Sequence, residues 1–282
     1  MEVYISAAIL AEPTLGQILD GTNVPEYLNG VGIIPGIKVD LGTERFLNSS
    51  ETFTKGLDGL AERLSKYKEQ HPALKFTKWR ATYIIGEDMP SGTALLKNAN
   101  DLASYAKIVQ DAGLVPIVEP EVLMNGGHDI ARSNEVTENV LTYVFRALNT
   151  AGVDYNGMIL KPNMVTPGSE AEKAGNGYVG VHTGALLKRV VPSEIAGIAF
   201  LSGGMGDEDA AINLGIAAES AHDYGFVPRV TFSFGRALLQ TPLQLYAQGN
   251  TEDAQKALLE RARTCLEASQ GTVPANNFRY SL

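Results

Sequence analysis

The chain has 282 residues, of which 44% are hydrophobic and 20% are charged, as in an ordinary globular protein with a full core. Its formal net charge of −9, without a dense basic run, argues against nucleic acid as a partner. A single cysteine, Cys265, excludes an internal disulfide framework, and no apolar stretch approaches the length of a membrane span. We therefore expect a cytoplasmic protein that binds neither nucleic acid nor membrane.

Predicted strands and helices alternate along the chain. Apolar runs rich in β-branched residues predict seven strands, at residues 3–10, 32–39, 77–85, 115–118, 157–161, 197–201 and 230–234. Apolar residues at helical spacing predict helices at 55–70, 92–112, 133–152, 181–190, 207–225 and 254–270, with Ser133 and Asp207 as N-caps. No linker rich in glycine, serine or proline divides the chain, so we expect a single domain over residues 1–282.

The spacing of polar residues near the C-terminal ends of these strands predicts the fold. Six such residues follow one another 34 to 42 positions apart: Lys38, Lys78, Glu119, Lys161, Ser202 and Arg236. A strand–helix unit of this length, iterated, is typical of the α/β fold called the TIM (β/α)₈ barrel, whose C-terminal strand ends converge on one mouth. An open doubly wound sheet is the alternative, but it would spread these ends along an edge. We favour the barrel, and because about seven units are visible where eight are needed, we expect it to be incomplete.

Lys161 ends an apolar strand and is followed directly by Pro162. A lysine at the inner end of a buried strand costs free energy unless it is paired or kept neutral. One interpretation is a side chain that reaches past the strand end into water. The other is an amine held neutral by burial and cationic neighbours, ready to attack a carbonyl carbon. On this stretch alone the first interpretation is favoured.

Several segments, in order, resemble class I (Schiff-base) fructose-bisphosphate aldolases. They are ISAAIL followed by EPTLGQ, then GIKVD, KWR, VPIVEPE, ILKPNMVTPG, FLSGG and FSFGRAL. The similarity extends from about residue 4 to 270, and KPNMVTPG with VEPE, GIKVD and FLSGG is a highly specific combination. An ILAADES-like strand, which in the family supplies an Asp near the Schiff base and serines for the distal phosphate, has no match. We therefore expect the chain to begin at the family's second strand.

The resemblance implies roles for individual residues. Lys161 corresponds to the Schiff-base lysine, Glu119 to the carboxylate that transfers protons, with Glu121 beside it, and Lys78 to the cation next to the amine. The implied substrate-binding residues are Lys38, Arg80, Ser202, Gly203, Gly204, Gly235 and Arg236. Tyr280 corresponds only weakly to a C-terminal tyrosine that reaches the site in animal members.

The resemblance also implies the activity: reversible cleavage of fructose 1,6-bisphosphate to dihydroxyacetone phosphate and glyceraldehyde 3-phosphate, in glycolysis and gluconeogenesis. The alternative is a truncated or catalytically impaired aldolase-like protein with a sugar-phosphate-binding site. No cofactor is expected, and no metal, because the four histidines lack the spacing of the zinc site that metal-dependent aldolases need. Since the family is usually tetrameric, a homo-oligomer is expected.

Overall fold

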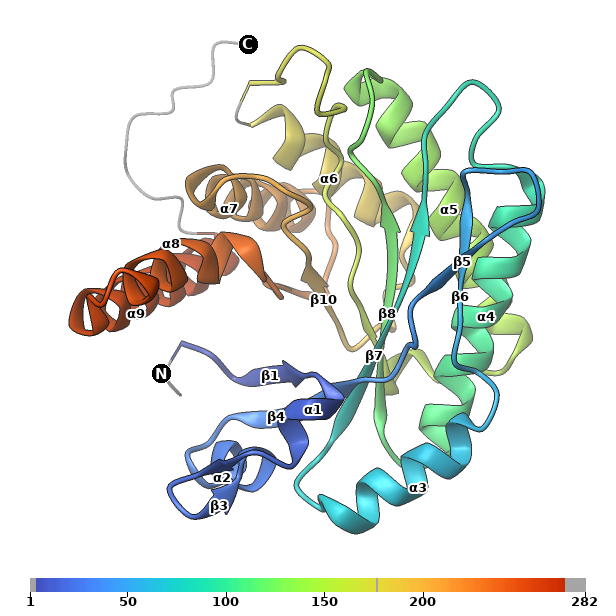
Figure 1. Cartoon of the computed structure of the whole chain (residues 1–282). Coiled ribbons are helices and arrows are strands. Elements are labelled where there is room, and N and C mark those ends of the chain that lie inside the picture. Colours follow the sequence, from blue (N-terminus) through green and yellow to red (C-terminus); the bar gives the residue numbers. More distant parts are fainter. Residues whose placement is uncertain (1–3, 176, 272–282) are drawn as a thin grey trace.

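The structure is a computed structural model that describes residues 4–175 and 177–271. Its centre is a curled sheet of seven parallel strands in the order β1-β4-β7-β8-β9-β10-β11 (Figure 1). The strands are β1 (Ala7–Leu10), β4 (Ile34–Lys38), β7 (Phe76–Tyr83), β8 (Val115–Val122), β9 (Ile159–Leu160), β10 (Gly197–Phe200) and β11 (Arg229–Phe232). Their order in the sheet is their order in the chain, as in the wall of a (β/α)₈ barrel.

Helices cover the convex outer face of this sheet (Figure 1). They are α3 (Leu60–Gln70), α4 (Gly92–Asp111), α5 (Ile130–Thr150), α6 (Tyr178–Val190) and α7 (Asp207–Asp223). Helices α8 (Arg236–Ala247) and α9 (Thr251–Ser269) lie instead at the open side of the sheet (Figure 1). The shorter elements are α1 (Glu12–Leu15), α2 (Val24–Gly30), the 3₁₀ helix η1 (Tyr155–Gly157), and two antiparallel hairpins, β2 (Ile18–Leu19) with β3 (Thr22–Asn23) and β5 (Thr43–Arg45) with β6 (Thr52–Thr54).

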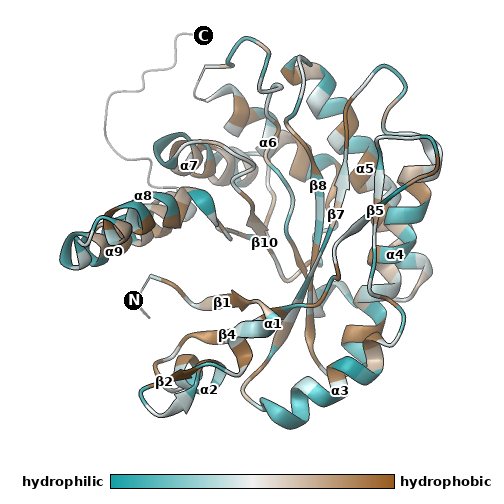
Figure 2. Cartoon of the chain, in the orientation of Figure 1, coloured by the Kyte–Doolittle hydropathy of each residue, from teal (hydrophilic) through white to brown (hydrophobic). Residues whose placement is uncertain are grey.

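The core lies between the sheet and the helices, and β7 shows how the sequence divides the two faces. Successive side chains of a strand point to opposite faces. Trp79 is fully buried and its ring stacks on that of Tyr105 from α4, with the ring centroids 5.4 Å apart. Lys78 and Arg80 alternate with Trp79 and therefore face the concave side. Figure 2 shows brown, hydrophobic stretches both on strands of the sheet and on the helices around it.

All seven predicted strands are present, with shifted ends, but several details of the prediction were wrong. Helix α5 begins earlier than expected: Asp129 is its N-cap and accepts a hydrogen bond from the Arg132 N–H at 2.7 Å, whereas Ser133 is buried inside the helix. Gly206, not Asp207, is the N-cap of α7. Helix α8 was not expected, since no helix was predicted between the strand at 230–234 and the helix at 254–270.

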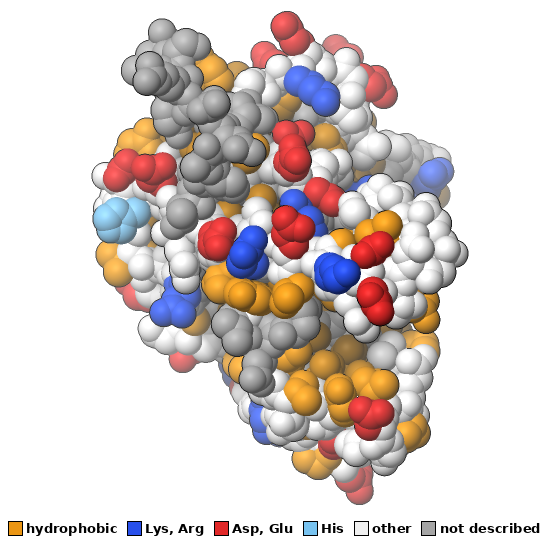
Figure 3. Space-filling model, turned by 90° about the vertical axis from the view of Figure 1, so that its left-hand side faces the viewer, with side chains coloured by type: hydrophobic (Ala, Val, Ile, Leu, Met, Phe, Trp, Pro, Cys, Tyr) orange, Lys and Arg blue, Asp and Glu red, His pale blue; other side chains and the backbone are white. Residues whose placement is uncertain are grey.

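Over residues 4–175 and 177–271 the sheet does not close, since β1 and β11 are its outermost strands. A cavity of about 970 Å³ lies between them, and its lining is mostly apolar. The lining includes Tyr4, Ile9, Val230, Phe232, Phe234, Leu238, Leu258 and Leu266. Hydrophobic side chains gather at and below the centre of this side of the molecule in Figure 3. Within the described residues, none of the helices is long and apolar enough to cross a membrane.

Candidate active site

Four of the predicted site residues come from four neighbouring strands of the sheet. Lys38 ends β4, Lys78 lies within β7, Glu119 lies within β8, and Lys161 directly follows β9. The strands hold them in register: Lys38 is paired with Lys78, and the Lys161 N–H donates to the Val118 carbonyl at 2.7 Å. The sheet therefore brings together residues that are far apart in the sequence.

Their side chains form a continuous line of alternating charges. Lys161 Nζ is 2.9 Å from Glu119 Oε1, and Glu119 Oε2 is 3.0 Å from Lys78 Nζ. Lys78 Nζ is also 3.4 Å from Asp40 Oδ2, and Asp40 Oδ1 is 2.6 Å from Lys38 Nζ. We call these five residues the charge line. Lys38 is its most exposed member, and the other four are at least nine-tenths buried. Buried charges are tolerated when each has an opposite partner, and this line provides one for every member.

Asp40 was not among the residues predicted for the site. In the structure it also contacts β7: Oδ2 lies 3.4 Å from Lys78 Nζ and accepts from the Arg80 N–H at 3.4 Å. Its position two residues after Lys38 places it on the same side of the chain. The second contact depends on the register between β4 and β7, which the sequence does not reveal.

Arg80 and Glu121 form a second pair, nearer the surface. The Arg80 Nε donates to Glu121 Oε2, and Glu121 is buried while the Arg80 side chain is 43% exposed. Burial lowers the pKa of Arg80, but the hydrogen bond and charge of Glu121, with Glu119 and Asp40 behind it, raise it above its ordinary value. Arg80 is therefore a permanent cation at the entrance to the charge line.

The remaining predicted residues lie on two loops, after β10 and after β11. Gly203 and Gly204 have φ angles of +60° and +104°, in the left-handed region that favours glycine. A Cβ added to Gly204 would lie 3.5 Å from Arg236 Nη2, so the Arg236 guanidinium lies directly against this loop. Gly235 and Arg236 begin α8, whose first N–H groups have no partner within the helix. Ser202, buried, precedes the two glycines. Backbone N–H groups, a hydroxyl and a guanidinium at one place are donors suited to a phosphate.

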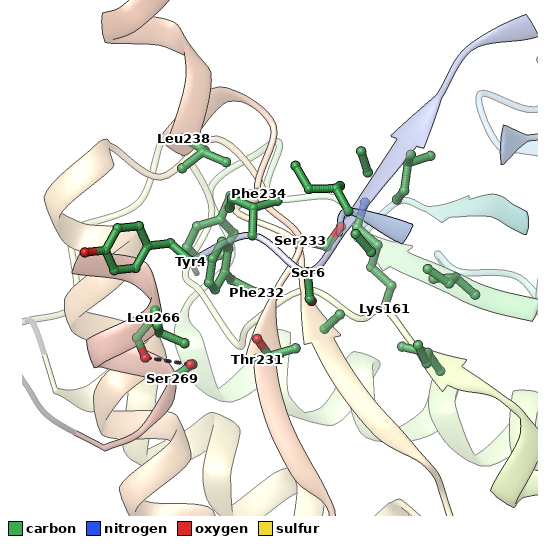
Figure 4. A pocket seen from close by; sticks show the side chains of 18 of the residues that line it. Tyr4, Ser6, Lys161, Thr231, Phe232, Ser233, Phe234, Leu238, Leu266 and Ser269 are labelled. Atoms are coloured by element: carbon green, nitrogen blue, oxygen red, sulfur yellow. Dashed lines mark hydrogen bonds between the residues drawn. The ribbon is translucent and has the colours of Figure 1, made fainter. Parts of the chain in front are cut away.

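The cavity between β1 and β11 reaches this region. Lys78 and Lys161 line it together with Ser233 and Gly235. Figure 4 shows the Lys161 side chain extending toward the part of the cavity where Ser6 and Ser233 lie. Within residues 4–175 and 177–271, three or more histidine, cysteine or acidic side chains nowhere gather into a group that could hold a metal ion. Tyr280 lies outside the described residues.

Comparison with known proteins places these features in a family. The family model described as "Glycolytic: Fructose-bisphosphate aldolase class-I" matches residues 1–280. The cytoplasmic isozyme 2 of fructose-bisphosphate aldolase from Pisum sativum is 44% identical over 95% of this chain and 75% of its own. Fructose-bisphosphate aldolase 2 from Caenorhabditis elegans is 45% identical over 95% of this chain and 74% of its own.

A solved structure agrees with these sequence matches. Fructose-bisphosphate aldolase from Plasmodium falciparum, crystallised with TRAP and a small-molecule inhibitor, superposes with a TM-score of 0.91 at 40% identity. The alignment covers 98% of this chain and 80% of that chain. The predicted TIM-barrel type is thus confirmed, and seven of its strands are seen in the described part of the chain.

Proposed function

Because the chain belongs to the class I fructose-bisphosphate aldolase family, we propose that it cleaves fructose 1,6-bisphosphate reversibly through a Schiff base on Lys161. The observation that carries the proposal is the position of Glu119, with one carboxylate oxygen 2.9 Å from Lys161 Nζ and the other 3.0 Å from Lys78 Nζ. The relatives named cytoplasmic or cytosolic support a cytoplasmic enzyme.

The first step is attack of the Lys161 amine on the ketone carbon of the substrate. This attack needs the neutral amine, and Glu119, whose Oε1 lies 2.9 Å from Lys161 Nζ, is placed to accept the proton that the amine gives up. The product is a carbinolamine, which loses water to give a protonated imine. Glu119, in contact with the amine, supplies the proton that leaves with that water and takes up protons in later steps.

The imine then accepts the electrons of the carbon–carbon bond as it breaks. Glu119, a carboxylate again once its proton has left with the water, takes the proton of the substrate's C4 hydroxyl as the bond breaks and glyceraldehyde 3-phosphate leaves. It returns that proton to the enamine carbon, and water then hydrolyses the resulting imine to dihydroxyacetone phosphate and the free Lys161 amine. The charge line keeps Lys161, Glu119 and Lys78 in contact before substrate arrives, so that little reorganisation is needed during these steps. Burial keeps water from screening their interactions.

The two phosphates of the substrate need two separate groups of donors. We assign the phosphate of the dihydroxyacetone half to Ser202, Gly203, Gly204, Gly235 and Arg236. The contact between Gly204 and the Arg236 guanidinium supports this assignment. Lys38 and Arg80, the exposed cations at the other end of the site, are assigned to the distal half of the substrate. An assembly of several copies, as the family resemblance implies, is part of the proposal.

The open edge of the sheet favours one alternative. A barrel that does not close admits water to Lys78 and Lys161 through the cavity between β1 and β11. In that case the chain would bind sugar phosphates but turn them over poorly or not at all.

Borohydride trapping decides between the two. The chain is incubated with dihydroxyacetone phosphate and sodium borohydride, and the modified lysine is located by peptide mass spectrometry. We expect a single adduct on Lys161, and none in a Lys161→Arg variant. A folded chain that binds the phosphate but forms no adduct would contradict the enzyme proposal and leave the impaired homologue.

A further inference from the structure

Asn163 lies two residues after Lys161 and joins its strand to β8 through a side chain. The residue is 6% exposed. Its Oδ1 accepts a hydrogen bond from the Val122 N–H at 2.8 Å. Its Nδ2 donates to the Met164 carbonyl at 3.0 Å and lies 3.5 Å from Thr137 Oγ1 on α5. A buried amide with partners for both its oxygen and its nitrogen has a fixed orientation.

This side chain acts where the backbone ladder stops. Strand β9 has only two residues, and its ladder with β8 ends at the bond from the Lys161 N–H to Val118. Pro162 follows and has no N–H to continue the ladder. Strand β8 continues to Val122, beyond the point where β9 ends, so its last residues have no β9 residue to pair with. The Asn163 oxygen takes the place of a ladder acceptor for Val122 at this point.

The two hydrogen bonds enclose the reacting pair. On β8, Glu119 lies between Val118, which accepts from the Lys161 N–H, and Val122, which donates to Asn163. We propose that Asn163 is a positioning residue that holds Lys161 and Glu119 at contact distance, an inference that rests on the proposed function. It touches neither reacting atom and acts through the backbone on either side of them.

The surroundings of Asn163 extend its effect to the phosphate loop. Asn163, Ser202 and Gly203 line the same crevice, whose volume of about 10 Å³ holds at most one water molecule. Loss of the Asn163 side chain would enlarge this crevice beside Ser202. The Val122 N–H would then be left without its partner, or would be bound by water that moves freely.

The test compares Asn163→Ala with a matched control. Asn98→Ala makes the same change at another buried asparagine, whose Nδ2 donates to the Thr52 carbonyl at 2.9 Å on the outer layer of the fold. We expect kcat for fructose 1,6-bisphosphate to fall about 10- to 100-fold in Asn163→Ala, since small misplacement of reacting groups has effects of this size. KM should change by less than about threefold, because binding is retained. Asn98→Ala should keep the kcat of the wild type and lose about as much thermal stability as Asn163→Ala does.

Two further measurements separate positioning from folding. Hydrogen exchange of the Val122 amide should be faster in Asn163→Ala than in the wild type, and it reports the lost bond without any substrate. Asn163→Asp keeps an acceptor for Val122 and should restore part of kcat. If Asn163→Ala fails to fold, the comparison is made with Asn163→Asp and Asn163→Ser. Of these two variants, the one whose Val122 amide exchanges more slowly should then have the higher kcat.

The outcomes are distinguishable. A wild-type chain that forms no borohydride adduct overturns the proposed function, and with it this inference. The positioning role alone is overturned if the wild type is active and Asn163→Ala keeps full kcat. This holds also when hydrogen exchange of the Val122 amide is faster in that variant.

Discussion

Glu119 and Lys161 come from neighbouring strands, and their side chains meet with Oε1 2.9 Å from Nζ. The main chain explains this contact. Val118 and Leu160 are registered partners in the β8–β9 ladder, so the next residue of each strand, Glu119 and Lys161, is also opposite its partner. The contact between the two side chains therefore depends on the register of β8 against β9. Because the backbone sets that register, Glu119 can be substituted without removing a hydrogen bond of the sheet.

Glu119→Gln is expected to remove proton transfer while keeping the shape of the site. The amide still contacts both lysines, but it cannot exchange a proton, and general acid–base catalysis contributes about 10²- to 10⁴-fold to rate. We expect kcat to fall within that range, measured by steady-state cleavage of fructose 1,6-bisphosphate.

Glu51→Gln is the matched control for this change. Glu51 is a buried carboxylate that accepts from the Ser91 N–H at 2.8 Å at the start of α4, away from Lys161. This substitution should lower stability without a comparable loss of kcat. Equal loss of kcat in both variants would mean that Glu119 acts only by supporting the fold.

Lys78→Met is expected to destabilise the fold as well as the reaction. Lys78 Nζ lies between Asp40 and Glu119, so its loss leaves two buried carboxylates short of a cation. Breaking a buried pair from one side costs about 3–5 kcal/mol. In a chain of this size that corresponds to a fall of about 10 °C in the thermal midpoint, measured by calorimetry.

The double variant Lys78→Met with Asp40→Asn tests the charge line itself. Asp40→Asn removes one of the two carboxylates that lose a cation in Lys78→Met. The double variant should therefore be more stable than the sum of the two single effects predicts, by about 0.5–3 kcal/mol. Additive losses would show that Asp40 and Lys78 are not coupled.

The strands, though not their exact ends, and the lysines on or beside them could be predicted from the sequence, because apolar runs and the polar residues near them are local features. The second contact of Asp40 could not be predicted, since it depends on the register of β4 against β7. Asn163 was missed for a similar reason: its partner, Val122, is 41 residues away. Helix α8 was missed because Pro242 lies inside it, and proline is a signal against a helix interior.

Gly184→Ala tests the close approach of α6 to α7. A Cβ at Gly184 would lie 2.6 Å from Ser220 Cβ and 2.7 Å from the Ala221 backbone nitrogen. Backbone cannot move aside cheaply, so overpacking of about 1–3 kcal/mol is expected, seen as a lower urea midpoint. Gly92→Ala, in the first turn of α4 with nothing within 4 Å of the added Cβ, is the control and should leave the midpoint unchanged or slightly raised. Similar midpoints in the two variants would contradict the close packing.

Cys265 provides a measure of global opening that does not depend on catalysis. The thiol is fully buried in α9, and this burial raises its pKa to about 11. The thiolate is the reactive form, so the native chain should react very slowly with iodoacetamide at pH 8, and the chain in urea should react at the rate of a free thiol.

Because the folded thiol of Cys265 holds its proton more tightly than the unfolded one, its contribution to stability is complete below about pH 9 and is lost as the pH rises toward 11. We therefore expect the free energy of unfolding to decrease over this alkaline range, and to decrease less in Cys265→Ala. Rapid native labelling at pH 8 would show that α9 opens without global unfolding, and that the apolar cavity beside it is lined by a mobile helix.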